Sequence, residues 1–151
     1  METAVSARQT CEASFDAISA LLKDDSSRIL QSTGGSGRDA RLAVSVHPRW
    51  PWKEHEESLR PEIGRYESVG TGQGRMNLSL HPEHTTYLPE IDGHLEVKRV
   101  SEDESEFRFI GECGDQGMWA KLHGGPGVAN EAVKQLLDQV IGSVRAQLAS
   151  A

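Results

Sequence analysis

The sequence has few cysteines and no long apolar run. Cys11 and Cys113 are the only cysteines among 151 residues, and they form no CxxC pair. We expect reduced thiols rather than a bridge, because residues 1–8 lack the basic start and apolar run of a secretory signal. No stretch approaches the roughly 20 apolar residues that cross a bilayer. These absences predict a cytoplasmic protein without membrane insertion.

Basic residues are also scarce. Lys and Arg number 16 against 23 Asp and Glu, which gives a net charge of -7, and basic runs stop at pairs such as Lys98-Arg99. Nucleic acids and anionic membranes need a basic footprint, so the charge argues against both as partners. Hydrophobic residues make up 36% of the chain, enough for one packed interior. We therefore expect a single domain over residues 1–151.

The first part of the chain predicts one strand and one short helix. Residues 5–11 alternate small or β-tolerant residues with polar ones, which favours a strand. Apolar residues then recur at helical spacing over residues 15–22, and Ser14 suits the N-cap of that helix. Asp24 and Asp25 interrupt it. Residues 28–30 fit a short turn, and the glycine-rich residues 33–37 fit a loop.

From there the apolar period changes from 3.6 to 2. Each alternating segment predicts a strand with one buried and one wet face, as in an antiparallel sheet covered on one side. Pro61 suggests an edge or irregular strand, and Pro82 a strand end. The acidic residues 101–105 predict a hairpin turn. The five alternating segments are residues 42–47, 58–63, 75–81, 95–98 and 106–109.

The C-terminal segment carries the clearest pattern. Apolar residues at spacings of three and four form one stripe from Ala129 to Leu148, and Pro126-Gly127 breaks the chain before it. We expect an amphipathic helix of about 20 residues, roughly 30 Å long. Gly142 falls opposite the stripe and costs about 1 kcal/mol of helix propensity relative to alanine. The element order predicts an α+β fold in which an antiparallel sheet of six to seven strands wraps around this helix.

Three local patterns resemble the START/polyketide-cyclase superfamily, often called SRPBCC. They are residues 87–97, similar to a proline turn that leads into a strand; the hairpin from residues 95–100 to 106–113; and the glycine-containing loop before the terminal helix. Residues 114–121 depart from the aromatic and proline-rich stretch that follows this hairpin in the family. The resemblance implies the helix-grip architecture and a cavity between sheet and helix. It implies no particular reaction.

A helix-grip sheet would turn its apolar rows inward. Such rows could line a ligand pocket, or they could pack against the helix and leave no void. Arg99 shares the strand parity of Leu95 and Val97, so it either anchors a ligand carboxylate or reaches water at the strand end. The inward rows also include Val44 and Leu59. The candidate ligand-binding residues are Met76, Leu78, Leu80, Tyr87, Val97, Arg99, Phe107, Phe109 and Trp119.

Other polar and aromatic groups have simpler interpretations. His81 and His84 form the densest histidine cluster, but Pro82 between them and the strand context do not suit a zinc site, so no metal and no cofactor are expected. Glu54, Glu56, Glu57 and Glu62 are interpreted as solvated charges rather than an acid–base pair. Residues 70–74 lack the Lys-Ser/Thr of a phosphate loop and predict a hairpin turn. The pair Trp50 and Trp52 either plugs the end of the core or lines a ligand entrance.

The sequence therefore leaves three functions open. The leading hypothesis is a protein that binds or carries a hydrophobic small molecule, such as a lipid, polyketide or aromatic metabolite, in the cavity. The second is a cyclase or dehydratase that uses His81, Tyr87 or Arg99 as an acid or base there. The third is a protein-interaction module with a filled core, whose acidic surface would favour basic partners. Ligand identity and oligomeric state do not follow from the sequence.

Overall fold

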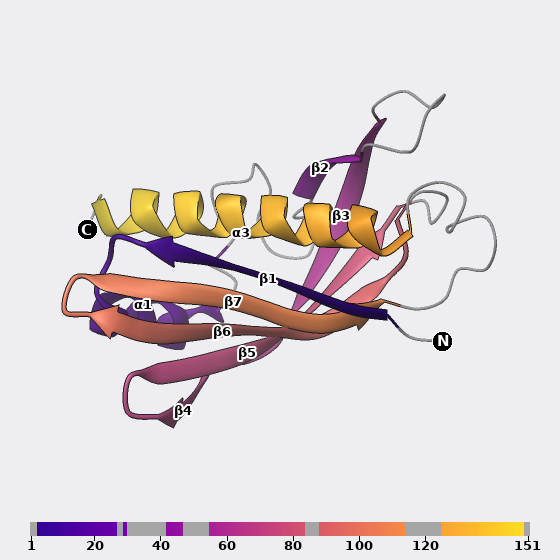
Figure 1. Ribbon diagram of the computed structural model, residues 1–151. Coiled ribbons are helices and arrows are strands. Elements are labelled where there is room, and N and C mark those ends of the chain that lie inside the picture. The colour runs from indigo at the N-terminus through magenta and orange to yellow at the C-terminus, as the bar shows by residue number, and fades with distance from the viewer. Residues whose placement is uncertain are drawn as a thin grey trace.

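A curved antiparallel sheet holds a long helix against its inner face (Figure 1). The computed structural model describes residues 3–26, 29, 42–46, 55–83, 88–113 and 125–149. No helix within these ranges is long and apolar enough to cross a membrane. The elements are β1 (Thr3–Cys11), α1 (Phe15–Asp24), β2 (Leu42–Val46), β3 (His55–Ile63), β4 (Glu67–Gly70), β5 (Gln73–Pro82), β6 (Ile91–Ser101), β7 (Glu104–Cys113) and α3 (Gly125–Ala149).

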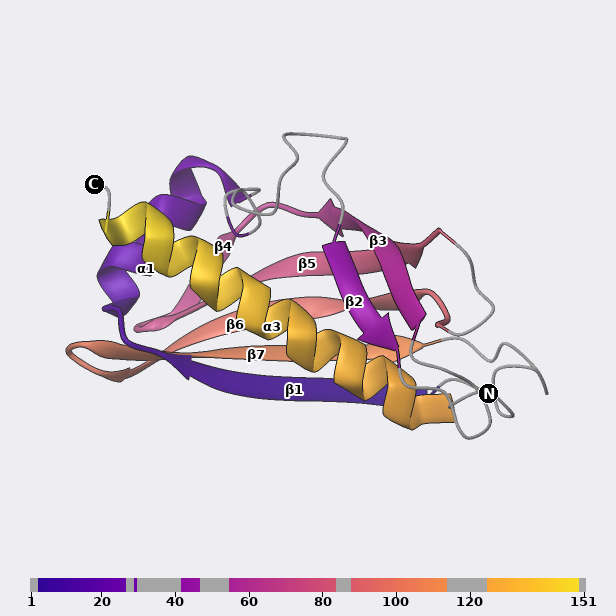
Figure 2. The same cartoon turned by 90° about the horizontal axis from the view of Figure 1, so that it is seen from above.

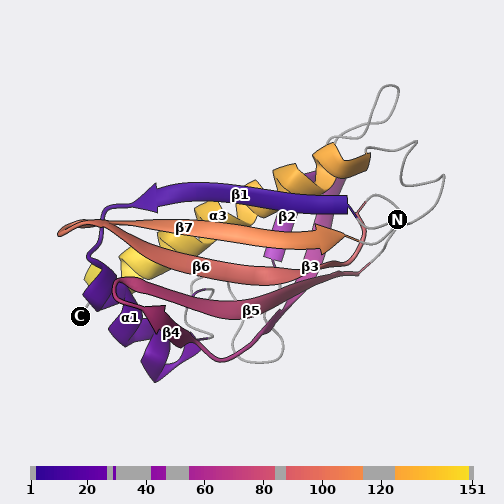
Figure 3. The same cartoon turned by 60° about the horizontal axis from the view of Figure 1, so that its bottom comes forward.

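The sheet has seven strands in the order β1-β7-β6-β5-β3-β2, with β4 paired to β5 off this path. Every pairing is antiparallel. The strands β1, β7, β6 and β5 run side by side along the body of the molecule, and β3 and β2 close one end (Figure 3). The predicted α+β class and the antiparallel sheet wrapped around a C-terminal helix are both confirmed.

The helix α3 runs diagonally across the sheet (Figure 2). Its stripe at spacings of three and four is buried, as the sequence predicted, and joins one core with the inner face of the sheet. Its exposed side carries Gly142, beside which an added Cβ would meet nothing within 4 Å. The fully buried apolar residues of the helix are Ala129, Ala132, Val133, Leu136, Leu137, Val140 and Val144.

Amide side chains of α3 bond to both edge strands of the sheet. Asn130 Oδ1 accepts from the backbone N–H of Ser6 on β1 at 3.1 Å. On the other edge, Gln135 bonds to the backbone of Ser45 on β2, and Gln139 Nε2 donates to the carbonyl of Ala43 at 3.0 Å. Backbone groups at an open sheet edge need partners. The helix supplies some of them, and it spans the gap between the two edges.

Local signals account for several element ends. The Ser14 side chain accepts from Ala17 N at 3.2 Å and caps α1, which ends at Asp24. Strand β5 ends at Pro82, as predicted. On one side of β3, Pro61 pairs with Leu80 of β5. On the other side, β2 pairs only with residues 55–59, so Pro61 lies beyond the stretch of β3 that β2 covers. Apart from the buried Ile29, the predicted turn at residues 28–30 and loop at 33–37 lie outside the described residues.

The strand β4 was not predicted. Its four residues are all exposed and show no alternation, so neither face leaves a hydrophobic signal. It forms a hairpin with β5 through Thr71 and Gly72, and Gly72 adopts φ +71, a left-handed conformation that glycine accepts without steric cost. The predicted hairpin turn at residues 70–74 is thereby confirmed.

Candidate functional site

The inner face of the sheet gathers the predicted apolar rows. Leu95 lies opposite Met76 on β5 and Phe109 on β7, and Val97 lies opposite Phe107. Cross-strand partners share a face, so these side chains form one continuous surface. All eight predicted inward residues are at most 1% exposed: Val44, Leu59, Met76, Leu78, Leu80, Val97, Phe107 and Phe109.

A pair of glycines seats the ring of Phe109. Gly93 and Gly111 lie directly opposite each other on β6 and β7. A Cβ on Gly93 would lie 2.7 Å from Phe109 Cζ, and one on Gly111 would lie 2.8 Å from Phe109 Cε1. The Phe109 ring thus occupies the space into which a side chain at position 93 or 111 would project. These glycines give no signal in the sequence, because their closeness depends on strand register.

The polar groups buried in the described interior are bonded within the protein. Tyr66 donates its hydroxyl to Ser19 Oγ at 3.1 Å, and burial raises the pKa of Tyr66 while this hydrogen bond opposes the rise. Ser105 Oγ donates to the carbonyl of Ala13 at 2.9 Å. Gln147 Nε2 lies 3.1 Å from Ser143 Oγ. These contacts hold elements together, and they leave the inner face predominantly apolar.

Arg99 lies at the end of β6 and reaches solvent. Its Nη2 is 2.9 Å from Asp16 Oδ1 on α1, and its guanidinium carbon lies 5.7 Å from the centre of the Phe15 ring. The side chain is 46% exposed. Of the two alternatives drawn from strand parity, the structure shows the one in which Arg99 reaches water at the strand end. The contact with Asp16 joins α1 to β6.

His81 lies on the outer face of the sheet, opposite Arg60. Its Nε2 is 2.9 Å from Glu62 Oε2, and its Nδ1 is 3.4 Å from Glu90 Oε1. The hydrogen bond that His81 donates to Glu62 is the main cause that raises the pKa of His81. Glu90 adds to the rise, and partial burial and Arg60 oppose it. A hollow of about 260 Å³ surrounds the ring, lined by Ser58, Arg60, His81, Pro82, Glu83 and Glu90.

These outer-face groups do not converge on one point. The two ring nitrogens of His81 face different carboxylates, and within the described ranges no group of three or more His, Cys, Asp or Glu is placed to hold a metal ion. His47, His84 and Glu54 lie outside those ranges, so the absence of a metal site stays a prediction. Glu56 and Glu62 are exposed, as expected for solvated charges.

The aromatic candidates from the connections remain untested. Tyr87 and Trp119, and the pair Trp50 and Trp52, lie outside the described residues. The two cysteines are described, and Cys11 and Cys113 are both buried with no bridge between them. Burial is the main cause that raises the pKa of both thiols.

Known structures share this arrangement of sheet and helix. Ara h 8.0201 matches with a TM-score of 0.54 and 9% identity over all of both chains. Norcoclaurine synthase from Thalictrum flavum, solved in complex with dopamine and hydroxybenzaldehyde, matches with a TM-score of 0.52 and 9% identity over 97% of this chain and 88% of that chain. Another structure of that enzyme gives 0.51 and 10% identity, with coverage of 100% and 88%.

These likenesses establish the fold. The chain has the helix-grip fold that the resemblance to the SRPBCC superfamily implied. No protein-family model and no curated protein matches the sequence. At identities near 10%, the shared fold carries no substrate or reaction with it.

Proposed function

We propose that the protein binds an apolar small molecule between the inner face of its sheet and α3. The observation that carries this proposal is the composition of the inner face. Its described residues are aliphatic, aromatic or methionine side chains on β5, β6 and β7, and the buried hydroxyls nearby are bonded within the protein. Six candidate contacts lie on this surface: Met76, Leu78, Leu80, Val97, Phe107 and Phe109.

The shared fold supports an aromatic or aliphatic ligand of modest size. A sheet that curls around a helix has a concave face, and ligand sites in proteins are usually concave and mostly apolar. Norcoclaurine synthase, which has the same fold, was solved with dopamine and hydroxybenzaldehyde bound. Tyr87 and Trp119 complete the proposed set of contacts, whereas Arg99 is engaged by Asp16 and takes no part in the proposal.

The enzyme alternative has less support from the described residues. A general acid or base must lie within hydrogen-bond reach of the substrate. His81 lies on the outer face. Arg99 continues the row of Leu95 and Val97, but it lies at the solvent-exposed end of that row and is engaged by Asp16. Tyr87 is the remaining candidate of the three. Binding without chemistry is therefore the function that the geometry supports best.

The proposal is tested first by native mass spectrometry. The freshly purified protein is compared with the same sample after denaturing extraction, and Nile red is then titrated into the extracted and refolded protein. We expect either a co-purified small molecule or saturable dye uptake at one molecule per chain. A clean mass together with no dye uptake would contradict the proposal and favour a filled core.

A pair of variants locates the binding. Val97→Phe adds volume to the buried inner face, whereas Val100→Phe changes a side chain on the same strand that is 53% exposed. We expect Val97→Phe to weaken Nile red binding by about tenfold or more, which corresponds to about 1.4 kcal/mol, and Val100→Phe to leave binding unchanged. If circular dichroism shows that Val97→Phe does not fold, Met76→Phe replaces it. Equal binding by both variants would place the dye elsewhere.

A further inference from the structure

A row of charged residues crosses the outer face of the sheet. The strand registers place Arg8 opposite Arg108, Arg108 opposite Glu96, Glu96 opposite Arg75, and Arg75 opposite Glu67. From β4 to β7 the signs therefore alternate across four strands. The alternation stops at β1, where two arginines face each other.

The two arginines differ in their surroundings. Arg108 has Glu96 opposite it and Glu106 within 3.7 Å of its Nη2. Arg8 makes no ion pair in the part of the chain that the structure describes, and its side chain is exposed. Like charges directly opposite on neighbouring strands destabilise a sheet. An anion beside Arg8 and Arg108 would relieve this repulsion and extend the alternation by one step.

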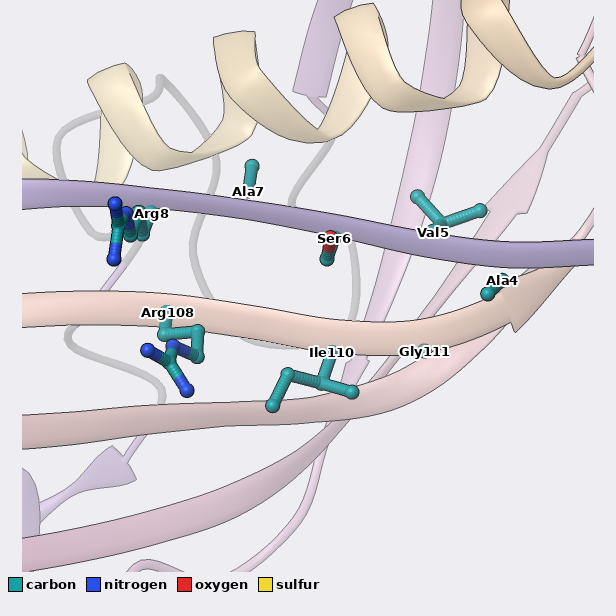
Figure 4. A pocket seen from close by; sticks show the side chains of 8 residues that line it. All are labelled: Ala4, Val5, Ser6, Ala7, Arg8, Arg108, Ile110 and Gly111. Atoms are coloured by element: carbon teal, nitrogen blue, oxygen red, sulfur yellow. The ribbon is translucent and has the colours of Figure 1, made fainter.

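A hollow lies beside these arginines. It is shallow and open, with a volume of about 570 Å³ that extends around the edge strand β1 onto both faces of the sheet. Figure 4 shows Val5 and Ala7 pointing toward the helix, whereas Ile110 and Ser6 lie on the opposite face, with both arginines grouped at one end. Ala4 and Ser6 are small, and Ile110 is 36% exposed. The hollow therefore combines a cationic end with an apolar wall.

We propose that this hollow binds an amphiphilic anion. A carboxylate or phosphate group would lie between Arg8 and Arg108, because planar guanidinium groups form paired hydrogen bonds with both kinds of anion. A short apolar body would lie against Ile110 and Ala4. Glu106 competes for Arg108, so Arg8 provides most of the selectivity.

The site is separate from the proposed inner cavity, and it suits a small molecule better than a peptide strand. A peptide would add to the free edge of β1 through backbone hydrogen bonds. At Ser6 this edge is occupied, because Asn130 of α3 accepts from its backbone N–H. The outer surface of the two strands remains accessible.

The test is a set of nuclear magnetic resonance titrations. Labelled protein is titrated with sodium octanoate, octyl phosphate, inorganic phosphate and octyltrimethylammonium. We expect octanoate and octyl phosphate to shift the Nε–Hε signals of Arg8 and Arg108 and the backbone amides of Ser6 and Ile110. Inorganic phosphate should bind at the same signals about tenfold more weakly or worse, because it lacks the apolar body. The cationic amphiphile should leave these signals unchanged.

Two matched variants decide the outcome. Arg8→Gln should weaken octyl phosphate binding at these signals by about tenfold or more. Arg75→Gln, in the same charged row but between Glu96 and Glu67, should leave it unchanged. Unchanged binding by Arg8→Gln, or equal shifts with the cationic amphiphile, would overturn the site. Equal affinity for inorganic phosphate would overturn the amphiphilic ligand. Methyl signals of Leu78 and Val97 report ligand binding at the inner face independently. An absence of shifts in these methyl signals would count against the inner-face proposal and not against the site at Arg8 and Arg108.

Discussion

Gln135 on α3 and Ser45 on β2 form a two-way amide pair. Gln135 Oε1 accepts from the Ser45 backbone N–H at 2.8 Å, and Gln135 Nε2 donates to the Ser45 carbonyl at 2.8 Å. A neighbouring strand would offer the same donor and acceptor to an edge residue. One turn later, Gln139 bonds to Ala43 on the same strand. The helix therefore replaces part of a missing strand along β2.

Removal of this amide pair should destabilise the protein. Each hydrogen bond contributes about 0.5–1.5 kcal/mol, so Gln135→Ala should lower the free energy of unfolding by about 1–3 kcal/mol. Gln139→Ala removes one bond and should cost about half as much. Urea unfolding at one pH measures both values. Equal stability of Gln135→Ala and the parent protein would show that water replaces the pair without loss.

Two glycine substitutions should have opposite effects on stability. Gly93→Ala introduces a Cβ against the Phe109 ring and the Ile110 carbonyl, and such overpacking costs about 1–3 kcal/mol. Gly142→Ala adds a methyl group in open space on a helix and should stabilise by up to about 1 kcal/mol. Thermal unfolding of the two variants measures the contrast. A stabilising Gly93→Ala would show that Phe109 moves aside at no cost.

The His81 carboxylate contacts should make stability depend on pH. The pKa of His81 in the folded protein is raised above its ordinary value of 6.5, mainly by the hydrogen bond that His81 donates to Glu62. The stabilising contribution is therefore fully present below pH 6.5 and is lost as the pH rises through the raised pKa. We expect Glu62→Gln to lower the pKa of His81, and Glu67→Gln on β4 to leave it unchanged. The histidine ring proton signals follow this titration, and an unshifted pKa in Glu62→Gln would contradict the assignment.

The buried Tyr66 hydroxyl should make the stability of the protein depend on pH in the alkaline range. Tyr66→Phe removes the hydrogen bond to Ser19 and should cost about 1 kcal/mol near neutral pH. The pKa of Tyr66 is raised above 10.0, so its stabilising contribution is present below pH 10 and is lost as the pH rises through the raised value. The stability difference between the parent protein and Tyr66→Phe should therefore narrow above pH 10. Chemical unfolding of both proteins near neutral pH and above pH 10 measures this difference. A difference that stays constant between the two conditions would contradict the prediction.

Periodicity was sufficient to predict the inner face and the terminal helix. Burial imposes a period of 2 on strands and 3.6 on helices, so the inward orientation of Met76, Leu78 and Leu80 could be predicted from the sequence alone. The same logic failed for β4, because all four of its residues are exposed. A strand without a buried face has no hydrophobic pattern to detect.

Contacts that depend on register were beyond the sequence. The proximity of His81 to Glu62, and of Gly93 to Gly111, exists only once β3, β5, β6 and β7 are aligned residue by residue. The surroundings of Arg99 could not be predicted for a similar reason, because its strand parity with Val97 gives no information about Asp16 on α1. The candidate site was therefore predictable in its apolar rows and not in its polar neighbours.

The bridge that α3 makes between the two edge strands has a consequence for synthesis of the chain. Ser6 and its helix partner Asn130 are 124 residues apart, and β1 pairs along its whole length with β7. Chains emerge from the ribosome N-terminus first, and contacts between distant residues slow folding. Strand β1 must therefore wait, unpaired and partly apolar, until β7 and α3 have been translated. A nascent chain arrested before β7 should bind chaperones and resist folding, whereas release after α3 should allow the whole sheet to close.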